Sequence, residues 1–401
     1  MQTQASDYLS PSDQRNNLWR LTLAQALAGA NSVVIFATGA IVGNSLAPSG
    51  LLATLPISVF VVGMAACILP AGAIARRYGR RAAFLTGTVA GVLVGLLAAL
   101  AVMLENFWLF NLATFFGGAY AAVTASFRFA ATDGLPPEKQ PQALSLVMAG
   151  GIAAGVVGPQ LVTHTLHIWP DHVYAASFLF QALIAVLAGI ALAGVRLPKP
   201  SLVEQQGGGR PLGIIARQPR FILAATLGAV SFMLMNFLMT AAPLAMHLEG
   251  HSHADSNSGI QWHVIAMYAP SFFTGKLIAR FGALNVSVTG LLLTALATLI
   301  ALMGETVAHF FWMLVILGIG WNFGFLGASA WVLSCHTAIE KTRVQSLNDF
   351  IVYGCMVIGS FASGGLLSLY GWHTVLWVSL VPLVIALAMV ALSKPSTHKP
   401  R

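Results

Sequence analysis

The sequence predicts an all-α membrane protein with twelve transmembrane helices, arranged as two halves of six. The composition, the spacing of apolar segments and an internal repeat support this prediction. Of 401 residues, 57% are hydrophobic and 8% are charged, and the mean hydropathy is +0.80. Soluble domains carry about 25% charged residues, so this composition excludes a soluble protein of ordinary type.

Apolar segments of about 20 residues, the length that crosses a bilayer, follow one another along the whole chain. The first six lie near residues 18–44, 51–75, 82–103, 107–130, 142–166 and 173–195. The second six lie near residues 219–246, 258–279, 284–303, 307–335, 346–369 and 373–393. An even number of spans places both termini on the same side of the membrane.

The distribution of positive charge determines the orientation. All 20 Lys and Arg residues lie in the terminal tails, in the loops that follow even-numbered spans, or at span ends on that face. Lys and Arg are retained on the cytoplasmic side of a membrane, so both termini are predicted to be cytoplasmic. This bias, together with contact to anionic membrane lipids, explains the net charge of +8 without a nucleic-acid partner.

A hydrophilic connector, residues 196–218, divides the chain into an N-terminal half (1–195) and a C-terminal half (219–401). Its Gly, Pro and Ser residues predict a flexible cytoplasmic linker. The halves repeat, because Gly72-Ala-Ile-Ala-Arg-Arg-Tyr-Gly79 aligns with Gly275-Lys-Leu-Ile-Ala-Arg-Phe-Gly282 at an offset of 203 residues. Repeats of this kind are typical of secondary transporters, whose substrate site lies between the halves near the midplane of the membrane.

The stretch after the second span resembles the cytoplasmic signature loop of the major facilitator superfamily. Five positions match that loop: Gly72, Arg77, Gly79, Arg80 and Arg81. The resemblance implies the major facilitator fold, with transport by alternating access. In that family an acid in the loop helps to latch the halves on the cytoplasmic side. Here Arg76 stands in its place, so the latch is either missing or uses another partner.

No motif for covalent chemistry or ATP hydrolysis is present. The sequence contains no Walker loop, no Gly-x-Ser-x-Gly elbow and no His-Glu-x-x-His zincin motif, patterns that mark the corresponding enzymes. The three cysteines give no disulfide framework and no Cys-x-x-Cys pair. We therefore expect a transporter, not an enzyme, without a tightly bound cofactor.

Spans seven and eight carry two motifs of soft ligands. Met235 and Met239 share one helical face, and His263 and Met267 share another, because residues four apart lie on one face. In an antiparallel pair of helices, Met239 would lie level with His263, and Met235 level with Met267. Cu(I) prefers thioether ligands, and imidazole also suits copper. These four residues predict a metal site, although methionine also fills irregular cores.

The same four residues resemble, position by position, the ligand motifs of the CcoA-type copper importers. The flanking Trp262, Ala269-Pro-Ser-Phe-Phe-Thr-Gly275 and Gly318-Ile-Gly-Trp-Asn-Phe323 are also similar to that family. The resemblance implies a multi-pass protein of the bacterial inner membrane that imports copper, its substrate, for cytochrome oxidase assembly. A cytoplasmic copper acceptor would then be a partner. It implies no clear role for Cys67, Cys335 or Cys355.

Two alternatives to copper import stay open. The wider family contains riboflavin carriers, so the substrate could instead be riboflavin or another planar organic solute, stacked on aromatic side chains such as Trp321 and Tyr120. A metal sensor or assembly factor that binds without transport is a different class. A complete twelve-span repeat disfavours that class, since a sensor needs no alternating cavity.

An outer loop contains three histidines that are candidates for capture of metal ions at the entrance: His247, His251 and His253. Their alternative is an ordinary solvated loop. Spans one, four, seven and ten would line the central cavity if the superfamily resemblance holds. This predicts four cavity-lining residues: Tyr120, Asn236, Trp321 and Asn322.

Arg128 and Asp349 lie near the cytoplasmic ends of spans four and eleven. Ionisable residues at membrane depth usually pair with one another or mark an ion pathway. We expect them to form an inner gate, with proton coupling as a second role for Asp349.

Overall fold

The computed structural model describes residues 9–49, 52 and 55–393, and the regular elements of this part of the chain are helical. The N-terminal half contains α1 (Pro11–Leu46), α2 (Leu55–Tyr78), α3 (Arg80–Met103), α4 (Phe107–Ala125), α5 (Phe127–Ala130), α6 (Gln140–Thr165) and α7 (Ala175–Ala193). The C-terminal half contains α10 (Pro219–Leu248), α11 (His253–Tyr268), α12 (Ser271–Phe281), α13 (Ala283–Leu302), α14 (Val307–Val332) and α15 (Lys341–Leu392). Two 3-10 turns, η2 (Pro137–Lys139) and η3 (Pro170–His172), precede α6 and α7.

The helices confirm the predicted twelve spans, with one span broken. Eleven segments within the described residues are long and apolar enough to cross a membrane. Two of them belong to α15, which is interrupted at Gly371 with φ 79°. The eighth span consists of α11 and α12, which are 16 and 11 residues long. They are separated at Pro270, which has no N–H to continue the helical hydrogen bonds.

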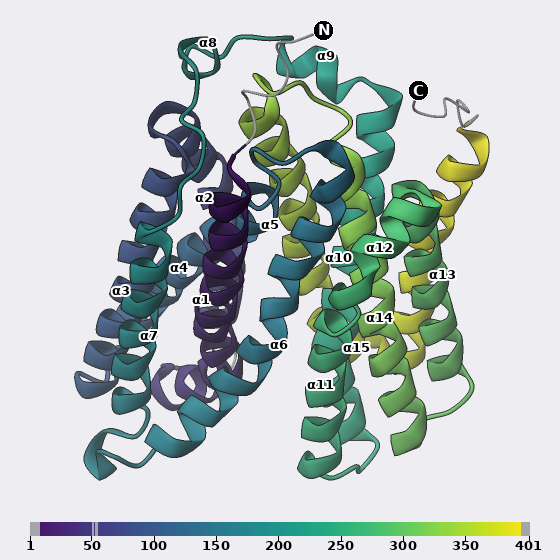
Figure 1. Ribbon diagram of the computed structural model, residues 1–401. Coiled ribbons are helices and arrows are strands. Elements are labelled where there is room, and N and C mark those ends of the chain that lie inside the picture. Colours follow the sequence, from purple (N-terminus) through teal and green to yellow (C-terminus); the bar gives the residue numbers. More distant parts are fainter. Residues whose placement is uncertain (1–8, 50–51, 53–54, 394–401) are drawn as a thin grey trace, which may run out of the picture.

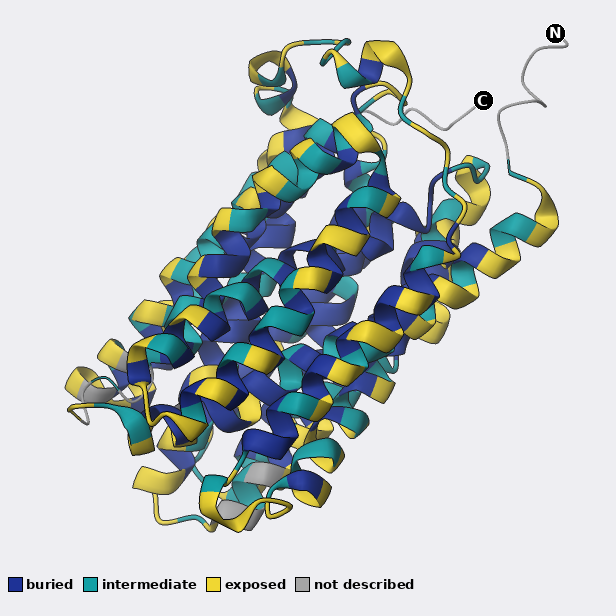
Figure 2. Cartoon of the chain, turned by 90° about the vertical axis from the view of Figure 1, so that its left-hand side faces the viewer, coloured by how far each residue is buried: buried dark blue, intermediate teal, exposed yellow. Residues whose placement is uncertain are grey.

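The two halves lie side by side, with α1–α7 on one side and α10–α15 on the other (Figure 1). The start of α1 and the end of α15 lie at the same end of the bundle, in agreement with the predicted topology. Between the halves, α2 packs against α15, and α6 packs against α12 and α11. Exposed residues lie mainly on the outer faces of the helices, whereas buried residues lie mainly toward the interior of the bundle (Figure 2).

The backbone preserves the internal repeat seen in the sequence. Gly79 begins α3 with φ 92° and ψ 158°, and Gly282 begins α13 with φ 86° and ψ 152°. Only glycine adopts such a positive φ without strain. The two signature loops therefore use the same turn, which explains why both end on glycine.

The connector differs from the predicted flexible linker because it is docked on the start of α15. It forms the short helices α8 (Leu202–Gln205) and α9 (Leu212–Ala216). Glu204 is buried and accepts a hydrogen bond of 2.8 Å from the Thr342 hydroxyl. Arg210 pairs with Glu340 at 2.7 Å, and its hydrogen bond holds the pKa of that carboxyl below its usual range. Buried carboxylates need such partners, and these partners fix the connector.

Candidate functional site

Charged side chains join the two halves at the cytoplasmic end. Arg128, on α5, pairs with Asp349 on α15, and both side chains are at least 94% buried. The Arg128 guanidinium also donates to the Ser329 hydroxyl on α14 at 3.2 Å. The pair links residues of opposite halves, and the cavity that Asp349 lines is only about 20 Å³, which is the arrangement expected of a closed inner gate.

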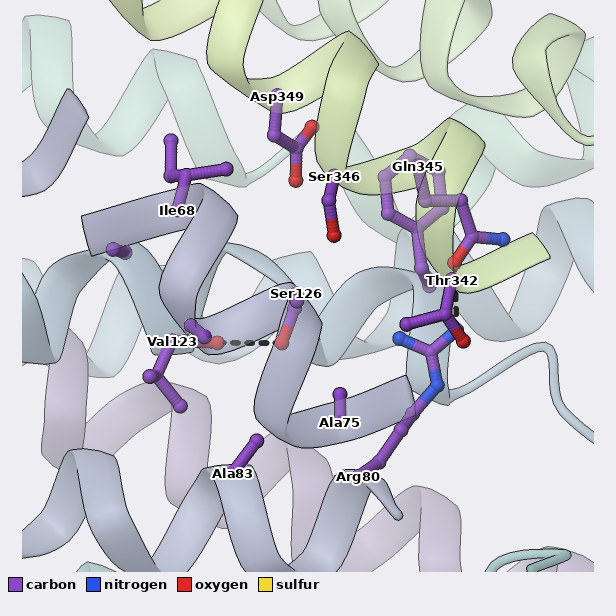
Figure 3. Close-up of a pocket in the computed structure, with 14 residues that line it drawn as sticks. Ile68, Ala75, Arg80, Ala83, Val123, Ser126, Thr342, Gln345, Ser346 and Asp349 are labelled. Atoms are coloured by element: carbon purple, nitrogen blue, oxygen red, sulfur yellow. Dashed lines mark hydrogen bonds between the residues drawn. The ribbon is translucent and has the colours of Figure 1, made fainter. Parts of the chain in front are cut away.

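Arg80 of the signature loop is the centre of a second network (Figure 3). Its guanidinium donates to Asp133 and to Gln345, each at 2.6 Å. Asp133 also pairs with Lys341 of the C-terminal half at 3.3 Å. Burial alone would raise the pKa of Asp133, but Arg80 and Lys341 outweigh it and hold the pKa below its usual value. Asp133 therefore supplies the negative charge that the signature loop lacks at Arg76.

The other signature residues differ in whether they contact the C-terminal half. Gly72 lies against Ser346 of α15, so closely that a side chain at position 72 would overlap the Ser346 hydroxyl. Arg77 and Arg81 are exposed, and the Arg77 guanidinium lies 5.4 Å from the ring centre of Tyr78. Arg80 and Gly72 thus join the halves, whereas Arg77 and Arg81 face the cytoplasm.

His336 lies beside this network and stays neutral. Its Nε2 is 3.2 Å from the side-chain nitrogen of Gln345. Burial lowers the pKa of His336 to about 4, although a hydrogen bond to the Thr337 carbonyl opposes this effect. The positive charges of the closed gate are therefore those of arginine and lysine.

Five aromatic side chains from four helices of the C-terminal half gather near the midplane, next to this gate: Phe232, Tyr268, Trp321, Phe325 and Tyr353. Trp321 stacks on Phe325, with ring centres 5.3 Å apart and planes 16° apart. Phe232 contacts Trp321, Phe325 and Tyr353 edge to face at 4.9–5.5 Å. We call these five residues the aromatic cluster. Phe325 also lies 4.6 Å beneath the Arg128 guanidinium, so the cluster and the gate are in direct contact.

The residues of the aromatic cluster differ in exposure. Phe232 and Tyr268 are partly exposed, whereas Trp321 is only 1% exposed behind them. The Tyr268 ring packs against Gly151 of α6, so it lies at the boundary between the halves. Trp321 was predicted from the sequence to stack on a planar substrate, whereas Phe232 and Tyr268 were not predicted. The signal was available on α10, where Phe232 shares a helical face with Met235 and Met239.

Two predicted cavity-lining residues lie in closely packed surroundings. Tyr120 is 1% exposed inside the N-terminal half, where its ring fills the space beside Gly91 of α3. Asn236 on α10 is 3% exposed. Within the described residues, the Tyr120 hydroxyl and the Asn236 side-chain nitrogen have no hydrogen-bond partner.

Asn322 holds the broken span together. Its side-chain nitrogen donates to the Met267 carbonyl and to the Ser271 hydroxyl, each at 2.7 Å, and its oxygen accepts from Thr274 at 2.6 Å. The Ala269 N–H still bonds the Ile265 carbonyl, but Pro270 has no N–H, so the carbonyls in the last turn of α11, including that of Met267, need other partners. Asn322 therefore satisfies a carbonyl freed by the break, and its hydrogen-bonding groups are already used. This structural role was not part of the prediction, which placed Asn322 among the cavity-lining residues.

Replacing Asn322 with alanine should destabilise the protein by about 1–3 kcal/mol, because a buried carbonyl and a buried hydroxyl lose their partner. Thermal unfolding of the purified protein in detergent measures this effect. Asn285 on α13 is the matched control, since its side chain is exposed and bonds only the nearby Phe281 carbonyl at 2.9 Å. An unfolding temperature equal to that of the parent in Asn322→Ala would contradict this role.

The soft-ligand residues divide into two groups. Met235 and Met267 are buried in one apolar cluster with Trp321, and Met239 packs against that cluster. His263 is fully buried and bonds the Leu314 carbonyl of α14 through Nδ1 at 2.6 Å. Its Nε2 has no partner within the described residues. The histidine therefore faces α14, the helix against which α11 mainly packs.

The outer loop is described at only part of the predicted capture residues. His251 bonds the Glu305 carbonyl at 2.6 Å and packs edge to face on Phe310. The side chain of His253 lies outside the described residues. No group of three or more His, Cys, Asp or Glu side chains that could hold a metal ion occurs in the described part of the chain, where His247 also lies.

The fold and the gate define a transporter of two rocking halves, and the sequence assigns it to a family. The chain belongs to the Major Facilitator Superfamily, which it matches over residues 21–269 and 229–401. It is therefore a transporter and not an enzyme, and a multi-pass protein of the bacterial inner membrane, as predicted.

Individual relatives support this assignment. The chain is 46% identical over 382 residues to the riboflavin transporter RfnT of Brucella anthropi, covering 94% of this chain and 95% of that protein. It is 27% identical to the uncharacterised transporter YdeG of Bacillus subtilis, over 92% and 94% of the two chains. The crystal structure of FucP in its outward conformation has a TM-score of 0.73 at 15% identity, over 94% of this chain and 98% of that chain.

Proposed function

We propose that the protein imports riboflavin, or a solute with a similar planar ring system, by alternating access. The observation that carries this proposal is the aromatic cluster at the boundary between the halves. Flat ring systems stack on aromatic side chains, and each stacked ring contributes about 1–3 kcal/mol. Phe232 and Tyr268 are partly exposed at this position. The 46% identity to a riboflavin transporter supports the same substrate class.

In this mechanism the substrate binds while the inner gate is closed. Phe325 touches both Trp321 and the Arg128 guanidinium, so binding on the cluster acts directly on the gate. Opening then requires that Arg128 leave Asp349 and that Lys341 leave Asp133. A proton on Asp349 would remove the charge that holds Arg128, which makes Asp349 the candidate for proton coupling.

Copper is a second candidate substrate, favoured by His263. Histidines that bind metals usually donate their second ring nitrogen to a carbonyl or carboxylate, as His263 does to Leu314. Its free Nε2, with the thioethers of Met235, Met239 and Met267, provides soft ligands of the kind that copper prefers. A cytoplasmic copper acceptor would be a partner only if copper is the substrate. The comparisons do not support copper import, which is why riboflavin comes first.

Uptake measurements distinguish the two substrates. Cells that lack their own riboflavin uptake, with and without this chain, are given radioactive riboflavin or radioactive copper. We expect the chain to increase riboflavin accumulation and to leave copper accumulation unchanged. His263→Ala should then retain riboflavin uptake. Copper uptake that depends on the chain and disappears in His263→Ala, without riboflavin uptake, would reverse the assignment.

A further inference from the structure

A cavity of about 180 Å³ lies between α6 and α12, on the side of the half-to-half interface away from α2 and α15. One water molecule needs only about 10–15 Å³ on the same measure. Gln142 and Ser145 of α6 and Ser271, Gly275 and Lys276 of α12 line it. The bound solute proposed above does not use this cavity, which lies apart from the aromatic cluster.

In the internal repeat, the residues around this cavity correspond to residues around the charged gate. Gln142-Ala-Leu-Ser-Leu146 of α6 aligns with Gln345-Ser-Leu-Asn-Asp349 of α15 at the same offset of 203 residues. Gly275 of α12 packs on Gln142 of α6, just as Gly72 of α2 packs on Ser346 of α15. The α2–α15 contact and the α6–α12 contact are therefore related by the repeat, and together they close the cytoplasmic end.

Two charged residues of the α2–α15 contact have uncharged equivalents in the α6–α12 contact. Leu146 takes the place of Asp349, and Ala283 takes the place of Arg80. The cavity at the first contact is about 20 Å³, whereas the cavity at the second is about 180 Å³. The α6–α12 contact thus has the larger cavity, and no acid is among the described residues that line it.

The groups that surround this space suit an anion. Lys276 is the one ionisable residue among the described residues that line it. Ser145 is 1% exposed, and its hydroxyl has no hydrogen-bond partner within the described part of the chain. A cation and an unused buried donor therefore meet at one cavity.

The depth of the cavity indicates where the anion comes from. Lys276 precedes the end of α12 by five residues, and Ser145 follows the start of α6 by five, so both lie about 8 Å from the cytoplasmic helix ends. Phe272, also at the cavity, is 64% exposed on the outer face of the bundle. The cavity is therefore accessible from the inner leaflet of the membrane, near the level of its headgroups.

We propose that this cavity binds the phosphate group of an anionic lipid of the inner leaflet. The Lys276 ammonium pairs with the phosphate, and the Ser145 hydroxyl donates to it. The lipid supplies the negative charge that Asp349 and Asp133 supply on the other side, and it bridges α6 and α12 while the cytoplasmic end is closed.

The test is a titration of the purified full-length chain, in neutral detergent, with short-chain phosphatidylglycerol, while the unfolding temperature is followed. We expect saturable stabilisation. Lys276→Gln should weaken the apparent affinity about fivefold, as expected for one lysine near an anionic lipid. Ser145→Ala should weaken it about tenfold, as expected for a hydrogen bond to a charged group. Lys199→Gln is the matched control, since Lys199 is an exposed cytoplasmic lysine outside the cavity.

Two further arms identify the source of the phosphate. Phosphatidylcholine, which has no net charge, should stabilise less than phosphatidylglycerol, and inorganic phosphate at equal concentration should not stabilise. Saturable stabilisation by inorganic phosphate that Lys276→Gln weakens would assign the cavity to free phosphate and overturn the lipid. Unchanged phosphatidylglycerol affinity in both Lys276→Gln and Ser145→Ala would overturn the site itself.

Discussion

Replacing Asp349 with leucine is expected to open the cytoplasmic end of the transporter. Arg128 then stays buried with an uncompensated charge, and a guanidinium cannot lose its proton to escape the cost. Removing one partner of a buried ion pair costs about 3–5 kcal/mol. The closed state should therefore lose population relative to the open state by a factor of about a hundred or more.

A cysteine at Ser126, which lines the small cavity at the gate (Figure 3), reports this opening. Its alkylation by an impermeant maleimide is measured in inside-out vesicles, in a background without Cys67, Cys335 and Cys355. Alkylation should be slow in the parent and fast in Asp349→Leu.

Two controls identify the ion pair as the cause. The double variant Arg128→Met with Asp349→Leu removes both charges and should restore slow alkylation, because matched apolar residues can replace a buried pair. Asp13→Ala removes a different cytoplasmic pair, Arg196–Asp13, whose arginine side chain is 80% exposed, and should have little effect. Equal alkylation in Asp349→Leu and the parent would show that this pair does not hold the gate.

Replacing Tyr268 or Phe232 with alanine should raise the KM for riboflavin about 5- to 150-fold, which corresponds to about 1–3 kcal/mol of lost stacking for each ring. The measurement is initial uptake at increasing riboflavin concentration, corrected for the amount of protein in the membrane. Tyr268→Phe keeps the ring and should keep the KM, because the predicted contact is with the ring and not with the hydroxyl.

Trp312→Ala is the matched control for the aromatic cluster. Trp312 lies on α14, like Trp321, but it is 56% exposed on the outer face and its ring contacts only Phe311 among the described aromatic residues. Its loss should not change the KM. Parent-like KM values in both Tyr268→Ala and Phe232→Ala would exclude the aromatic cluster as the binding site.

Only part of the inner gate could be predicted from the sequence. Arg128 and Asp349 are recognisable as a candidate pair because charge is rare at membrane depth. Asp133 was not recognised, since it lies in a loop where an acid is ordinary. Its partners Arg80 and Lys341 come from opposite halves of the chain, and only their positions in space reveal that the three charges meet.

The surroundings of Asn322 and Trp321 could not be predicted from the sequence either. Asn322 and Trp321 both look like cavity residues from their place on span ten. The polar groups of the Asn322 side chain are all hydrogen-bonded to residues around the break at Pro270. The rings of Phe232 and Tyr268 pack against Trp321. Which polar or aromatic face remains free depends on neighbours from other helices.

The sequence by itself determined the twelve spans, their orientation and the repeat of the two halves. These properties depend on hydrophobic length and on the side of the membrane where Lys and Arg lie, and each can be read along the chain. The tertiary structure alone decided that Asp133 joins Arg80 to Lys341, that the connector is docked, and that Phe232 and Tyr268 are the partly exposed members of the aromatic cluster. These features depend on contacts between residues as far apart as Arg128 and Asp349, 221 positions in the sequence, and such contacts exist only when the helices have packed.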